Sequence, residues 1–175
     1  MKQKRFVAVV AMMLCLGVLL TGCGKIDSVT KSEFAKVMDA KEYKVEDQSS
    51  MIRDDSLKVV YMAVPEKEAD ADADTDASKE ESTYAGQHQV EFYEFKDAES
   101  CEAAFDKMVD EQKAVYKNAS KYSCKEKDVS NGGSVTITTD EILYRIVCAD
   151  ETMVIGISSP DRADEINGIF DALGV

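Results

Sequence analysis

The chain of 175 residues carries 34 acidic and 21 basic side chains, and its net charge of −13 disfavours nucleic acid and anionic lipid surfaces as partners. Its length suits one ordinary domain that can bury a core, so its stability does not require disulfides. One histidine is too few for a site with two imidazole ligands, such as the zinc motif HExxH.

The N-terminal residues are the first feature along the chain. Lys2, Lys4 and Arg5 precede an apolar run over residues 6–20, and no acidic residue occurs before Asp27. The run is shorter than the ~20 residues that cross a bilayer comfortably. A basic start, a short apolar core and small residues after it are typical of an export signal rather than of a permanent span.

Residues 20–23 end this run with the sequence LTGC. They resemble the lipobox of bacterial lipoprotein precursors, in which an aliphatic residue, a small residue and Gly or Ala precede the cysteine. The resemblance implies that residues 1–22 are a removable signal peptide, that the Cys23 thiol carries a diacylglyceryl group, and that the mature chain is anchored on the extracytoplasmic face of the cell membrane. Cys15 lacks the small preceding residues and is expected to be ordinary signal core. An uncleaved or conventionally cleaved signal is the alternative.

Cleavage before Cys23 removes three basic and no acidic side chains, so the net charge falls from −13 to −16 over the remaining 153 residues. Residues 23–29 would be the lipidated cysteine and a short tether, whose six residues after the cysteine reach at most ~20 Å. Residues 30–175 are predicted to form a single domain that works close to the bilayer.

The first half of this domain carries one helix signal and several strand signals. Thr30 and Glu33 form a capping box for a helix over about residues 31–41. Apolar, β-branched or aromatic stretches predict strands over residues 43–46, 57–64 and 88–95.

The second half begins with a helix that Asp97 caps. The stripe of that helix comprises Cys101, Phe105, Met108, Val109, Gln112 and Val115. Residues 131–133, Asn-Gly-Gly, predict a hairpin, and acidic turns separate strands expected over residues 134–139, 142–148 and 152–158. Ser159 and Pro160 begin a last helix, and Gly174 follows it.

The order helix, strands, helix, strands, helix with short strand connections favours an α+β fold, an antiparallel sheet with helices on one face in a two-layer sandwich. Residues 34–39 (FAKVMD) resemble residues 105–110 (FDKMVD). Either a duplicated helix-plus-strands unit or the chance similarity of two amphipathic helices explains this repeat.

The segment over residues 66–82 is strongly acidic and has no large apolar side chain, so a mobile loop between two strands is expected. Its weak calcium candidate comprises Asp70, Asp72, Asp74 and Glu81, at positions 1, 3, 5 and 12 of an EF-hand-like loop. Thr75 occupies the position where that motif needs Gly, and an alternating Asp-Ala tract generates the spacing by itself. No specific metal site is therefore predicted.

Three cysteines follow Cys23, namely Cys101, Cys124 and Cys148, and no CxxC pair occurs. An odd number without such a pair indicates neither a disulfide framework nor a thioredoxin-type redox site. Cys101 is expected to be a buried, inert thiol, and free thiols in an exported chain would suit a reducing or anoxic habitat. His88, alone at the start of a strand, is expected at the surface.

The sequence contains no GxSxG, GxGxxG or GxxxxGK[ST] motif, and an SxxK match at residues 28–31 has no SDN or KTG partner. No catalytic residue and no cofactor is predicted. The expected function is a non-catalytic binding or interaction module near the membrane surface, with a membrane-proximal protein as its partner. A small solute-binding component of a transporter and an envelope hydrolase are the alternatives. The overall plan resembles small surface lipoproteins of Gram-positive bacteria, which implies no particular activity.

Overall fold

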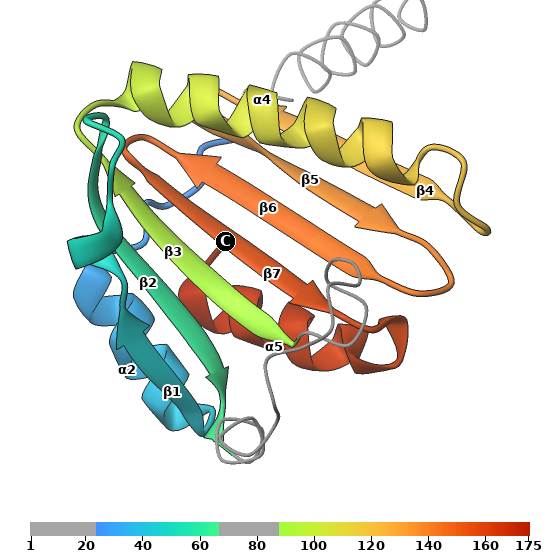
Figure 1. Cartoon of the computed structure of the whole chain (residues 1–175), viewed down its shortest axis with the longest axis horizontal. Helices are drawn as coiled ribbons and strands as arrows, with labels where there is room; N and C mark the ends of the chain where they lie inside the picture. The colour runs from blue at the N-terminus through green and yellow to red at the C-terminus, as the bar shows by residue number, and fades with distance from the viewer. Residues whose placement is uncertain (1–23, 67–87) are drawn as a thin grey trace, which may run out of the picture.

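The computed structural model describes residues 24–66 and 88–175 (Figure 1). The main elements, in chain order, are α2 (Lys31–Ala40), β1 (Tyr43–Asp47), β2 (Leu57–Pro65), β3 (Gln89–Phe95), α4 (Ala98–Tyr116), β4 (Ser123–Val129), β5 (Gly132–Thr138), β6 (Leu143–Ala149), β7 (Thr152–Ser158) and α5 (Ala163–Leu173). Two short 3-10 turns, η1 (Ser49–Met51) and η3 (Pro160–Arg162), complete the described chain.

The strands form one seven-stranded antiparallel sheet in the order β1-β2-β3-β7-β6-β5-β4. Two meanders, β1 to β3 and β4 to β7, meet where β3 pairs with β7. The predicted α+β class and the antiparallel sheet are confirmed. Each meander follows a helix in the chain, as a duplicated unit would, but the two helices cover opposite faces of the sheet.

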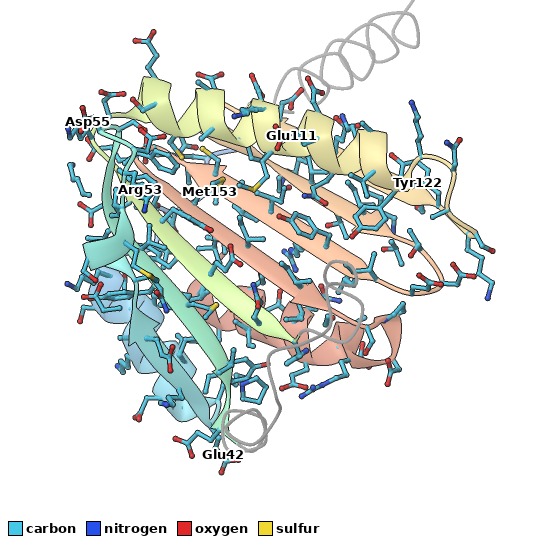
Figure 2. The ribbon with its side chains drawn as sticks, in the orientation of Figure 1. Glu42, Arg53, Asp55, Glu111, Tyr122 and Met153 are labelled. Carbon is cyan, nitrogen blue, oxygen red and sulfur yellow. The ribbon has the colours of Figure 1, made fainter. Side chains whose placement is uncertain are left out.

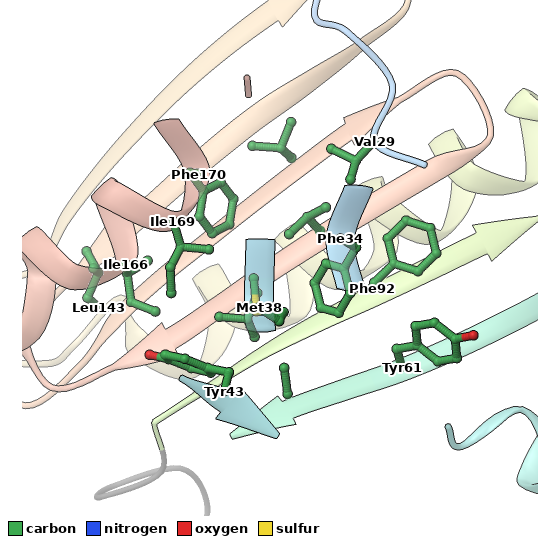
Figure 3. Close-up of a cluster of buried hydrophobic side chains, with 14 residues drawn as sticks. Val29, Phe34, Met38, Tyr43, Tyr61, Phe92, Leu143, Ile166, Ile169 and Phe170 are labelled. Carbon is green, nitrogen blue, oxygen red and sulfur yellow. The ribbon is translucent and has the colours of Figure 1, made fainter. Parts of the chain in front are cut away.

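Helices α2 and α5 cover one face of the sheet, where Phe34, Met38 and Phe170 pack against strand residues such as Phe92 (Figure 3). This part of the core contains fourteen buried residues, which include Val29 from the segment before α2. The sequence predicted all helices on one face, in two layers. Helices α2 and α5 share a face, but α4 lies on the other, so this finer part of the prediction was wrong.

Helix α4 covers the opposite face, where Cys101, Phe105 and Val109 pack on β5, β6 and β7. Met153 of β7 lies on this face (Figure 2). Strands β6 and β7 are apolar at nearly every position, so both of their faces must be shielded from water. Helix α4 shields the face that α2 and α5 leave open. Val115, predicted on the buried stripe, is 65% exposed, because Tyr116 contacts the core at this end of α4 instead.

Helices α2 and α4 begin where the sequence predicted, because a capping side chain precedes each of them. The Thr30 side chain accepts a hydrogen bond from the Glu33 N–H, and Glu33 binds the Thr30 N–H in return, which completes the capping box. Asp97 accepts from the Ser100 N–H at 2.7 Å and caps α4. The last helix differs in its start, because Pro160 opens a 3-10 turn and α5 begins only at Ala163.

Candidate functional site

Residues 24–30, predicted as a tether and a helix cap, are docked against the sheet. The Ile26 N–H donates to Asn131 Oδ1 at 3.1 Å, and Asn131 Nδ2 donates back to the Ile26 carbonyl at 2.9 Å. The Ser28 hydroxyl donates to Asp150 Oδ2 at 2.5 Å, and Val29 is only 3% exposed. The segment thus follows the surface of the domain instead of extending away from it, because its polar atoms find partners in two strand turns.

The two turns that hold this segment also contact each other. Asn131 lies in the β4–β5 turn and Asp150 in the β6–β7 turn, and the Asp150 N–H donates to the Asn131 carbonyl at 2.8 Å. Asp150 has a positive φ of 51°, which tight turns require and Asp tolerates. We call this edge of the domain, defined by the turns at Asn131 and Asp150, the docking end of the sheet.

A pocket of about 810 Å³ lies at the docking end, between residues 28–30, the first turns of α2 and the sheet. Its lining comprises Ser28, Val29, Thr30, Lys31, Ser32, Ala35, Tyr61, Glu94, Asp150, Glu151 and Thr152. Glu94 and Thr152 face each other across the β3–β7 pair, so strands from both meanders contribute to the floor. The volume lies in the range of about 300–1,000 Å³ that small-ligand sites occupy.

The pocket combines apolar walls with a charged rim. Val29, Ala35 and Tyr61 supply carbon surface, while Glu94 and Glu151 share one cation, Lys58, at 3.7 and 3.0 Å. Such a lining suits a ligand that has an apolar body and a polar or cationic end.

Two further charges border the pocket. The Lys31 ammonium lies over the Tyr61 ring at 5.0 Å from its centre, and its pKa is raised chiefly by its hydrogen bond to Tyr61. Hydrogen bonds from Ser28 and then Asn131 lower the pKa of Asp150, which keeps this carboxylate ionised at neutral pH. Because Ser28 donates to Asp150 and Lys31 lies over Tyr61, the SxxK match at residues 28–31 is not arranged as a Ser-Lys nucleophile pair.

A second polar group lies at the opposite end of the sheet, where β3 begins. His88 is only 4% exposed, so the prediction of a surface histidine was wrong. Its Nε2 contacts the Tyr43 hydroxyl and lies 3.3 Å from Glu165 Oε1, and the Tyr43 hydroxyl donates to the same oxygen at 2.9 Å. His88 is buried where Tyr43 of β1 and Glu165 of α5 lie against it.

Glu165 is the charged centre of this second group. Burial raises its pKa, but hydrogen bonds from Tyr43 and Arg162 and the charge of His88 outweigh that effect, so the pKa lies below its ordinary value. The Arg162 guanidinium donates to Glu165 Oε2 at 3.1 Å. The arrangement ties β1, β3 and α5 together through polar contacts.

The residues predicted for lipid and calcium, Cys23 and the set Asp70, Asp72, Asp74 and Glu81, lie outside the described residues. Within residues 24–66 and 88–175, no group of three or more His, Cys, Asp or Glu side chains is placed to hold a metal ion. In the same part of the chain, no helix combines the length and apolar character needed to span a bilayer.

The pocket is not apparent from the sequence, because its lining comes from residues as far apart as Ser28 and Asp150. The local signal was the acidic turn at residues 150–151, which the sequence indicated only as a separator between two strands. No protein-family model and no curated protein matches this chain. The function is therefore argued from the geometry of the chain itself.

Proposed function

We propose that this protein is a lipoprotein, anchored through Cys23 on the extracytoplasmic face of the cell membrane, that binds its partner without catalysis in the pocket at the docking end. One observation carries the proposal: the segment that directly follows Cys23 forms a wall of the pocket. Anchor and pocket are thereby parts of one continuous structure.

The docking of this segment limits how far the domain can stand from the bilayer. The Ser130 N–H donates to the Gly24 carbonyl at 3.3 Å, so contact with the sheet begins one residue after Cys23. Since one residue spans at most ~3.6 Å, a lipid on Cys23 would hold the docking end at the membrane surface. The pocket would then meet partners that lie at the headgroup level.

The lining indicates the chemistry of such a partner. Three carboxylates, those of Glu94, Asp150 and Glu151, surround apolar walls, and Lys58 neutralises part of their charge. A basic and apolar segment of an exported or membrane protein would bury its apolar part and meet opposite charge at the rim. A small solute that a transporter carries is the second candidate, which the pocket volume favours.

In-cell photocrosslinking tests the binding role. A photoreactive residue at Ser32, on the pocket wall, should trap one recurrent adduct, whereas the same probe at Asp140, in the β5–β6 turn at the opposite end, should not. Ala35→Phe would obstruct the pocket and should abolish the Ser32 adduct. Equal trapping from Ser32 and Asp140, or an adduct that survives Ala35→Phe, would contradict a binding role for this pocket.

Membrane fractionation tests the anchor separately. Cys23→Ala should move the protein from the membrane to the soluble fraction, because the lipid attachment point is lost. Cys15→Ala is the matched control and should leave the protein in the membrane fraction. Membrane retention of Cys23→Ala would refute the anchor while leaving the crosslinking result to stand alone.

A further inference from the structure

Two buried cysteines from different layers of the domain meet in the core beneath α4. Cys101 in the first turns of α4 and Cys148 near the end of β6 are 0% and 1% exposed. Their Sγ atoms are 2.7 Å apart, about 0.7 Å more than a disulfide bond. Among the three cysteines that the structure describes, Cys124 is the exception, since it lies half-buried on strand β4 near Glu126.

The backbone on both sides holds the two sulfur atoms in this position. The Asp97 cap fixes the start of α4, and the Cys101 N–H donates to the Asp97 carbonyl at 3.2 Å. Cys148 is paired with Gly133 on β5 and with Met153 on β7. The position of the pair is therefore set by a capped helix and a central strand.

Phe105 of α4 packs on the strand next to the cysteine pair. A Cβ built at Gly133 would lie 3.4 Å from the Phe105 ring, which is an ordinary van der Waals distance, so the ring lies against this strand. Phe105 lies one helical turn after Cys101, and Gly133 is the cross-strand neighbour of Cys148. The contact of Phe105 with β5 thus holds α4 against the sheet beside the cysteine pair.

We infer that Cys101 and Cys148 form a disulfide bond in the exported protein, which joins α4 covalently to β6. The two thiols lose two protons and two electrons as the S–S bond forms. A protein disulfide of the thiol-oxidase class in the export compartment accepts them and is reduced to two thiols. This pairing replaces the expectation of an inert free thiol at Cys101 and leaves Cys124 as the remaining thiol.

The surroundings determine when the bond forms. Exchange with an oxidant requires a thiolate and access to it, and both sulfur atoms are buried in the folded domain. The neighbouring Cys148 thiol and then burial raise the pKa of Cys101 far above its ordinary value, which removes the thiolate as well. The bond therefore forms before α4 is fully docked, and the folded core then protects it from reductants.

Thiol counting on the mature protein tests the bond. The full-length gene is expressed with its signal, and accessible thiols are alkylated at lysis. The protein is then purified from membranes, unfolded without reductant and alkylated with a second reagent, which labels free thiols that were buried. Peptide mapping should find Cys124 alkylated, Cys101 and Cys148 unmodified, and a crosslinked peptide pair that separates only after reduction. Alkylation of Cys101 and Cys148 without reductant, or a crosslink that involves Cys124, would overturn the inference. The result does not depend on the state of Cys23, because each peptide is assigned separately.

A stability measurement provides the second test. The bond would close a loop of 47 residues, so protein reduced in denaturant and refolded in reductant should melt about 10 °C lower than the untreated protein. The Cys124→Ala variant should show the same shift on reduction, and the double variant Cys101→Ala, Cys148→Ala should show none. If the double variant does not fold, the comparison of untreated with reduced Cys124→Ala decides the question. An unchanged melting temperature after reduction would contradict the disulfide.

Discussion

Helix α5 packs tightly on the sheet at Gly156 of β7, and replacing this glycine with alanine tests that contact. A Cβ at this position would lie 2.7 Å from Phe170 Cε2 and 2.9 Å from Ile166 Cγ2, both on α5. Neither side chain has room to withdraw, because both are fully buried in the cluster that Figure 3 shows. Gly156→Ala must therefore push α5 away from the sheet or force these side chains from their rotamers.

The magnitude follows from two opposing effects. Overpacking of a close-packed core costs ~1–3 kcal/mol. Alanine also restricts the unfolded chain more than glycine does, which raises the free energy of unfolding by ~0.4–1 kcal/mol. Gly156→Ala should therefore lower the free energy of unfolding by ~1–2 kcal/mol and the melting temperature by ~3–6 °C for a domain of this size.

Gly168 on α5 supplies the matched control. The nearest atom to a Cβ at Gly168 is Lys41 Nζ at 3.8 Å, the end of a flexible side chain, so alanine fits there without a clash. Gly168→Ala should raise the free energy of unfolding by ~0.5–1 kcal/mol, because glycine inside a helix is unfavourable. The same Gly→Ala change should therefore lower the free energy of unfolding at Gly156 and raise it at Gly168.

Urea unfolding of the wild-type protein and both variants measures these differences. The expected order of midpoints is Gly168→Ala, wild type, Gly156→Ala, with unchanged slopes of the unfolding free energy against urea. A Gly156→Ala variant as stable as the wild type would refute the close packing of α5 on β7. A destabilised Gly168→Ala variant would show that the environment of α5 differs from the one described.

Three further predictions concern the polar contacts. Thr30→Ala removes the capping box and should lower the free energy of unfolding, measured in urea, by ~1 kcal/mol. Ser32→Ala, two residues later and outside the capping pair, should be nearly neutral. Asn131→Ala removes both hydrogen bonds to Ile26, so amide exchange at Ile26 should accelerate; unchanged exchange would contradict the docked segment. The folded-state pKa of Glu165 lies below its ordinary value of 4.5, so its ionised form stabilises the fold above that pH and loses this effect as the pH falls through the folded pKa. Glu165→Gln should therefore be most destabilising near neutral pH and progressively less so below pH 4.5; a pH-independent difference would contradict the ion-pair account.

The sequence predicted those parts of the fold that local chemistry determines. The Thr30–Glu33 capping box and the Asp97 cap are confirmed, because each depends on residues at most three positions apart. Strand β7 has the predicted limits, since its seven residues form a nearly continuous apolar run between an acidic turn and a proline.

The sequence did not delimit β4, whose residues SCKEKDV lack an apolar alternation. This strand is formed by pairing with β5 at the sheet edge, where its lysines face solvent and where charge also discourages pairing with other chains. Its existence depends on a neighbour in the sheet rather than on its own composition.

The layer arrangement and the polar sites depend on contacts between distant residues. His88 is buried because Glu165 and Tyr43 reach it from elements 77 and 45 positions away in the chain. The pocket likewise joins Ser28 to Asp150, and the cysteine pair joins α4 to β6. Such contacts are fixed by the order of strands in the sheet, which local patterns do not specify.

Mass spectrometry of the N-terminal peptide, from protein extracted from the membrane fraction, tests the lipid anchor on Cys23. The peptide should begin at Cys23, carry a diacylglyceryl group on the thiol and be found with the membranes. An N-terminal peptide that begins elsewhere, or an unmodified Cys23 in protein recovered from the soluble fraction, would contradict it.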